Sequence, residues 1–78
     1  MEIKDRASFA KFIGDLLESL QTKPESWENN SLERFLEALQ AYTLGIQGYY
    51  NNIEPGQNAD VPSWKVFADI LKGASVYE

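Results

Sequence analysis

Two tryptophan residues, each at or just before the start of an amphipathic stretch, most constrain what this chain can fold into. Trp27 precedes apolar residues spaced three and four apart from Leu32 onward, and Trp64 opens a similar series near the end of the chain. A third series runs from Phe9 to Leu20. This spacing places side chains on one face of an α-helix. We therefore predict an all-α, compact three-helix bundle-like domain with helices at about 5–21, 31–51 and 62–77.

The length and cysteine content restrict how such a domain is held together. A chain of 78 residues is expected to form one domain, 1–78, and to bury only about 60–65% of the surface that it exposes when unfolded. It has no cysteine, so neither a disulfide nor a thiolate zinc site can contribute. The hydrophobic content of 44% is sufficient for a folded core. Helix packing must therefore supply the stability, and there is little room for an enclosed active site.

The three apolar series predict which side chains form the core. The longest is the middle one, which includes Leu32, Phe35, Leu36, Leu39, Thr43, Ile46 and Tyr50. We expect the structural core to contain Phe12, Leu16, Trp27, Phe35, Leu39, Tyr50, Trp64, Phe67 and Leu71. The two tryptophans can act as core residues or as interface anchors, and the core role is favoured because large aromatic side chains dominate the cores of small domains.

Helix ends are marked by capping residues and prolines. Asp5 or Ser8 suits the start of the first helix, and Pro24 ends it. For the second helix, Asn30 forms a capping-box-like pair with Glu33, although Asn29 or Ser31 can cap instead. For the third helix, Pro62 suits the first position, with Asp60 or Val61 as the preceding cap.

The net charge of -5 is confined to the middle of the chain. Residues 25–60 contain six acidic side chains and only one basic side chain, Arg34, whereas the two ends are each neutral. A negative field repels nucleic acid and favours a basic protein partner. Solubility alone also accounts for an acidic surface.

The residue types argue against catalysis. The chain has neither histidine nor cysteine, which are the commonest catalytic and metal-binding side chains. Glu33 and Glu37 lie four residues apart, but two carboxylates do not meet the six or more oxygens that hard cations usually require. We predict no catalytic residue, no metal site and no cofactor, and hence a protein that is not an enzyme.

Two sets of residues are candidates for binding a partner. Glu33 and Glu37 form the polar face of the middle helix, and Leu44 lies among them. A second apolar stripe on the last helix includes Val66, Ile70 and Tyr77, beside the stripe that contains Trp64. The first set predicts an interaction module of the immunity, antitoxin or adaptor type that binds a basic protein. The second predicts, as the alternative, a homodimer formed through the third helix.

The sequence also suggests a location. No apolar run follows a basic N-terminal start, and no stretch approaches the ~18 apolar residues of a membrane span. We expect a cytoplasmic protein that does not bind membranes.

Several short elements recur together in a known type of bacterial protein. They are Trp27-Glu28-Asn29, Pro62-Ser63-Trp64 and Tyr77-Glu78, with Leu32, Phe35-Leu36-Glu37-Ala38, Tyr49-Tyr50, Ala68, Ile70-Leu71 and Ala74 between them. As a set, they resemble a family of short bacterial single-domain proteins, a family that is classified as a domain of unknown function. The resemblance covers nearly the whole chain and implies a bacterial, stand-alone domain, but no activity. Tyr42 departs from it, since a tryptophan is expected there; the change keeps an aromatic ring.

Overall fold

Three α-helices account for most of the chain. The computed structural model describes residues 2–76, with α1 at Arg6–Thr22, a 3-10 turn η1 at Pro24–Ser26, α2 at Leu32–Ile53 and α3 at Trp64–Val76. No strand occurs among these described residues. The predicted all-α, three-helix class is confirmed, and each helix begins and ends within two residues of its predicted limit.

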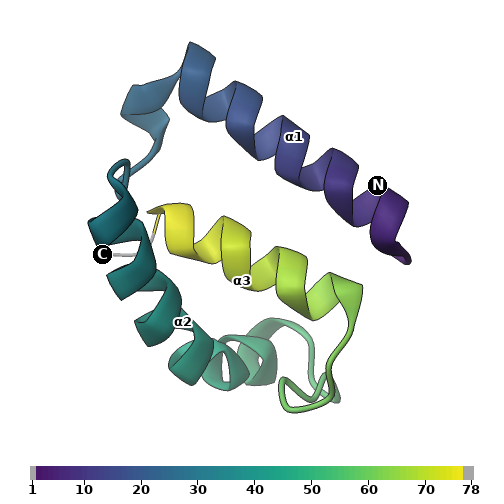
Figure 1. The fold of residues 1–78 in the computed structure, drawn as a ribbon. Helices are drawn as coiled ribbons and strands as arrows, with labels where there is room; N and C mark the ends of the chain where they lie inside the picture. Colours follow the sequence, from purple (N-terminus) through teal and green to yellow (C-terminus); the bar gives the residue numbers. More distant parts are fainter. Residues whose placement is uncertain (1, 77–78) are drawn as a thin grey trace.

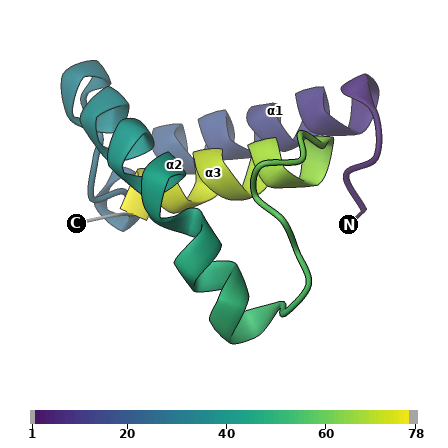
Figure 2. The same ribbon diagram turned by 90° about the horizontal axis from the view of Figure 1, so that it is seen from below.

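The helices are arranged almost in one layer. α1 and α3 lie side by side and run in the same direction, while α2 crosses past the C-terminal end of α3 (Figure 1). The C-terminal half of α2 leaves this layer, and a loop then returns the chain to the start of α3 (Figure 2). The molecule measures 35 × 28 × 18 Å, so its shortest dimension is less than two helix diameters. Most side chains therefore lie close to the surface.

A capping box starts α1. The Asp5 carboxylate accepts a hydrogen bond from the backbone N–H of Ser8 at 2.8 Å, and the Ser8 hydroxyl oxygen accepts one from the backbone N–H of Asp5 at 3.1 Å. The bond from the Ser8 backbone, and then one that the Ser8 hydroxyl donates to the Asp5 carboxylate at 2.7 Å, lower the pKa of Asp5 because they favour its charged form. The helix ends where Pro24 begins the 3-10 turn, since proline lacks the N–H that would continue the ladder.

Hydrogen bonds attach the segment between α1 and α2 to α1 and to the end of α3. The Trp27 indole N–H donates to the Ser19 hydroxyl of α1 at 2.7 Å. The amide of Asn29, which is buried, donates to the carbonyl of Ala74 at 2.9 Å, and its backbone N–H donates to the carbonyl of Ser75 at 3.1 Å. These last two bonds satisfy carbonyls in the final turn of α3, which have no partner within the helix.

The core lies between α2 and α3. Ile46, Tyr50 and Val66 are almost fully buried there, with Tyr42, Ala59 and Ile70 packed around them. Tyr42 crosses α3 over Gly73, and a Cβ added to that glycine would overlap the tyrosine ring. Gly73 therefore permits the close approach of the two helices at this point.

The loop between α2 and α3 is held by one glutamine. Gln47 donates from its amide nitrogen to the carbonyl of Gln57 at 2.9 Å and accepts from the N–H of Ala59 at 2.7 Å. At the loop's end, the Ser63 hydroxyl accepts from the N–H of Val66 at 3.1 Å. Ser63 is thus the N-cap of α3, so the expected caps Asp60 and Val61 and the helical position of Pro62 were wrong. Serine is a stronger cap than valine because its hydroxyl satisfies an unpaired N–H.

The faces of α3 differ from those expected. Val66, predicted to face a partner, is buried against α2 with 2% of its surface exposed. Phe67, predicted as core, is 41% exposed because α1 covers only part of that side of α3. Of the other predicted core residues, Tyr50 is buried, whereas Phe12, Leu16, Trp27, Phe35, Leu39, Trp64 and Leu71 are partly buried. No helix within residues 2–76 is long and apolar enough to cross a membrane.

Candidate functional site

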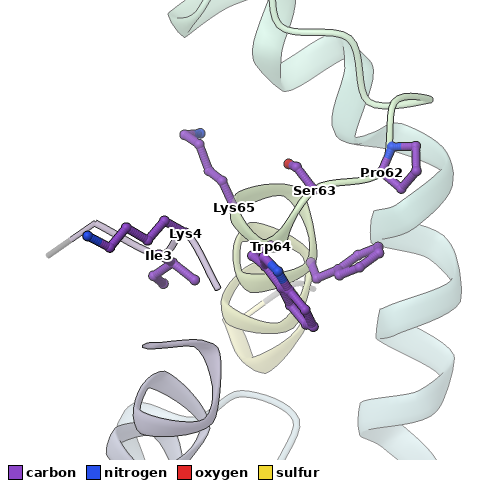
Figure 3. Close-up of a pocket in the computed structure, with 7 residues that line it drawn as sticks. Ile3, Lys4, Pro62, Ser63, Trp64 and Lys65 are labelled. Atoms are coloured by element: carbon purple, nitrogen blue, oxygen red, sulfur yellow. The ribbon is translucent and has the colours of Figure 1, made fainter. Parts of the chain in front are cut away.

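A hollow beside the start of α3 is the first surface to consider for binding. It has a volume of about 360 Å³ and lies between the N-terminal segment and α3 (Figure 3). Its lining residues are Ile3, Lys4, Pro62, Ser63, Trp64, Lys65 and Phe67. The hydroxyl oxygen of Ser63 is already used as a helix cap. The hollow thus offers an aromatic wall and two lysine side chains, but its lining includes no base that would activate the serine.

The polar groups next to this hollow form a cluster that joins α2 to α3. The Tyr50 hydroxyl donates to Asp69 at 2.7 Å, and the Lys65 ammonium contacts Asp69 at 2.8 Å and Glu54 at 3.1 Å. The same ammonium lies 5.2 Å from the centre of the Tyr50 ring. Each group has a partner inside the chain, so the cluster links the two helices rather than leaving a group available for a ligand.

The ionisation of this cluster does not suit acid–base catalysis. Burial, together with the Asp69 carboxylate, raises the pKa of Tyr50 well above its usual range. The hydrogen bond to Asp69 raises the pKa of Lys65, since it favours the charged ammonium. A general acid or base works best with a pKa near the working pH, and both shifts lead away from neutrality.

The outward side of α2 carries exposed leucines beside glutamates. We call this surface the outer face of α2; it consists of Leu32, Glu33, Leu36, Glu37 and Leu44. Leu32, Leu36 and Leu44 are 74%, 52% and 82% exposed, and both glutamates are exposed as well. The leucines follow a spacing of four residues, with Gln40 between the second and the third, so they form one ridge along the helix.

The charges on this face are not neutralised within the described part of the chain. Arg34, the one basic residue of α2, lies 3.7 Å from Glu28. Neither Glu33 nor Glu37 forms an ion pair among residues 2–76. The outer face of α2 therefore combines apolar contact area with two uncompensated negative charges.

A second hollow lies at one end of this face. It occupies about 280 Å³ where the end of α1, the segment after η1 and the start of α2 meet. We call it the joint hollow; its lining residues are Leu20, Trp27, Asn29, Asn30, Ser31, Leu32 and Phe35. The rings of Trp27 and Phe35 lie 5.9 Å apart and are tilted by 35°. Leu32 belongs both to the hollow and to the outer face of α2.

The predicted partner-binding residues fall into two places. Glu33, Glu37 and Leu44 share the outer face of α2. Val66 and Ile70 instead pack against α2, so the structure does not bring them to the same surface as the first set. Tyr77 lies outside the described residues.

Two exposed leucines were missed as partner-binding candidates. Leu32 and Leu36 were assigned to the buried stripe of the middle helix, because their spacing from Phe35 and Leu39 fits one face. The series Leu32, Leu36, Gln40 and Leu44, in which each residue is four positions from the next, is the signal that separates them from that stripe. Among the described residues, no three acidic side chains come together in a way that could hold a metal ion.

Comparison with known proteins gives a family but no activity. No curated protein and no solved structure matches the chain. The sequence from residue 5 to residue 78 matches a family described as a family of unknown function, DUF7660. The matched region includes the Trp27-Glu28-Asn29 segment, in which Asn29 bonds to the end of α3, and the Ser63 cap. Since the match extends over nearly the whole chain, the protein belongs to the DUF7660 family.

Proposed function

We propose that this protein is a small acidic interaction module that binds a basic region of another protein through the outer face of α2. The observation that supports this most is the ridge of Leu32, Leu36 and Leu44, each more than half exposed. Single exposed leucines are common on protein surfaces, but an apolar ridge beside charged residues is typical of a binding surface. A helix ridge of this spacing packs well against another helix.

The charge of the same face supports a basic partner. Glu33 and Glu37 run parallel to the leucine ridge, and the surrounding segment 25–60 carries the whole net charge of the chain. Lysine or arginine residues beside an apolar contact would complement this surface and accelerate association. Bacterial immunity proteins, antitoxins and small adaptors share this size and charge, and we place the protein in this functional class, as a cytoplasmic binding protein and not as an enzyme.

Self-association through α3 has less support. Val66 and Ile70, which would form that interface, pack against α2 within the same chain. Two copies meeting through the outer face of α2 would also bring Glu33 and Glu37 of each copy near one another, which is unfavourable for like charges.

Charge reversal on a matched background tests the proposal. Immobilised wild type, a Glu33→Lys/Glu37→Lys variant and a Glu2→Lys/Glu18→Lys control would capture proteins from a bacterial lysate at increasing salt. The control makes the same charge change at exposed positions away from the outer face of α2. We expect the first variant alone to lose a basic protein that wild type releases as salt rises, because salt screens exposed charges. Equal capture by all three proteins would contradict the proposal.

A further inference from the structure

The joint hollow is lined mainly by apolar surface. Leu20, Trp27, Leu32 and Phe35 contribute to this surface, beside the polar residues Asn29, Asn30 and Ser31. The indole N–H of Trp27 donates to Ser19, the side-chain amide of Asn29 donates to Ala74, and the hydroxyl of Ser31 accepts from the N–H of Arg34. The hollow beside the start of α3 differs because two lysines, Lys4 and Lys65, line it.

The size of the joint hollow suits one large side chain. Its volume is about 280 Å³. An apolar cavity of about 150 Å³ is enough to bind benzene. A phenylalanine or leucine side chain from another protein would therefore fit between Trp27, Leu32 and Phe35. Because the hollow is already open in the unbound chain, binding would need little rearrangement.

The charges around the joint hollow restrict what can carry that side chain. Between Glu25 and Glu37 the chain has four glutamates and one arginine, a net charge of -3. Glu33 directly follows Leu32 and has no ion pair among the described residues, whereas Glu28, which follows Trp27, lies 3.7 Å from Arg34. A segment with acidic residues next to its apolar side chain would be repelled, whereas one with lysine or arginine there would be attracted.

From these observations we infer that the joint hollow binds one large apolar side chain that the partner presents between lysine or arginine residues. This inference rests on the proposed function and names the anchor of the same interface, since Leu32 connects the hollow to the outer face of α2. The partner segment would place its anchor in the hollow and continue along Leu36 and Leu44. Interfaces commonly concentrate their binding energy in one such pocket-bound side chain.

A peptide titration tests the anchor directly. The probe is a 12-residue synthetic peptide with one central phenylalanine, two lysines on each side, and glycine and serine elsewhere. It would be added to the ¹⁵N-labelled full chain and followed by ¹H–¹⁵N NMR. We expect the indole N–H signal of Trp27 and the amides of Asn30 and Leu32 to shift. Replacing the phenylalanine by serine, or the lysines by glutamate, should weaken binding by about tenfold or more, the effect of losing one buried apolar contact or the charge match.

A matched pair of variants separates the hollow from the rest of the face. Leu32→Ser removes a wall of the hollow, while Leu44→Ser makes the same change two turns beyond Leu36 on the same face. Both side chains are more than 70% exposed, so neither change removes core packing. We expect Leu32→Ser to weaken peptide binding by about tenfold and Leu44→Ser by no more than about twofold.

The possible results distinguish the two proposals. If Leu44→Ser weakens binding and Leu32→Ser does not, or if no signal of the hollow shifts up to about 5 mM peptide, the anchor site is overturned. The proposed function would still stand if Glu33→Lys/Glu37→Lys then abolished capture of the basic protein. If the peptide occupies the hollow but Glu33→Lys/Glu37→Lys captures the same proteins from the lysate as wild type, the anchor site stands and the proposed function fails.

Discussion

α1 and the α2–α3 pair are held in different ways. α2 and α3 enclose the fully buried Ile46, Tyr50 and Val66 and are linked by the cluster around Asp69. α1, whose residues are all described, has no fully buried side chain. It is attached through the Phe9 ring, 5.2 Å from that of Trp64, and through the Trp27–Ser19 hydrogen bond. The comparison indicates that the folding free energy comes mainly from α2–α3, while α1 leaves apolar side chains such as Ile13 and Leu17 exposed.

The largest expected effect follows from shortening one apolar side chain in the core between α2 and α3, compared with shortening one in α1. Ile46→Ala should lower the free energy of unfolding by about 2–5 kcal/mol, because it leaves a cavity between α2 and α3. Leu17→Ala removes similar atoms from α1, but Leu17 is 53% exposed, so we expect a loss below about 1 kcal/mol. Urea unfolding followed by circular dichroism measures both. Equal losses would show that α1 is held as firmly as the other two helices.

A pair of glycine substitutions should have effects of opposite sign. Gly73→Ala should destabilise the protein by about 1–2 kcal/mol, because the added methyl group overlaps the Tyr42 ring and overpacking outweighs the gain in helix propensity. Gly14→Ala lies on α1 with no atom near the added methyl group, so it should stabilise by up to about 1 kcal/mol. Thermal melts of the two variants would reveal the difference. A stabilising Gly73→Ala would mean that the two helices can move apart at little cost.

A smaller effect is expected from removing one hydroxyl between α2 and α3. Tyr50→Phe deletes the donor to Asp69, which keeps its contact with Lys65, so we expect a loss of about 1–2 kcal/mol. Tyr49→Phe is the matched control, since Tyr49 is half-exposed. Denaturant titrations of the two variants check the prediction. If Tyr49→Phe costs as much as Tyr50→Phe, the cluster does not stabilise the helix pair.

The smallest expected effect concerns the start of α1 and is visible mainly in acid. The pKa of Asp5 is lowered in the folded chain, so its stabilising contribution is complete above the unfolded value of about 3.9. The contribution disappears as the pH falls through the lower, folded pKa. Asp5→Asn keeps a capping side chain without the charge. Wild type should therefore lose more stability than the variant as the pH falls below about 4. Helicity followed by circular dichroism as the pH is lowered measures this loss. Parallel curves of helicity against pH for the two proteins would contradict the prediction.

The sequence predicted the helices well because their apolar spacing is local information. The limits of all three helices were within two residues, and Asp5 is the cap of α1 as expected. The cap of α2 is Ser31, which was an alternative to Asn30. The cap of α3 was expected at Asp60 or Val61 because Pro62 suits a first helical position by sequence alone. Which residue begins the helix depends on the path of the preceding loop, which Gln47 holds by hydrogen bonds.

The faces of the helices were harder to predict because they depend on distant contacts. α3 has two neighbouring apolar stripes, and its orientation is set by Gly73 against Tyr42 and Asp69 against Tyr50. Leu32 and Leu36 are likewise exposed because they lie on the outer face of α2, whereas Ala38, in the same part of the helix, is buried.

The bonds from Asn29 to the end of α3 also have a consequence for the order of folding. They join residues 45 positions apart, and closing a loop of that length in a disordered chain costs about 3 kcal/mol in entropy. Once α2 and α3 have paired, most of that loop is already closed, and the remaining entropy loss is small. These bonds should therefore form after the helix pair, as a late step that commits the polypeptide to its final topology.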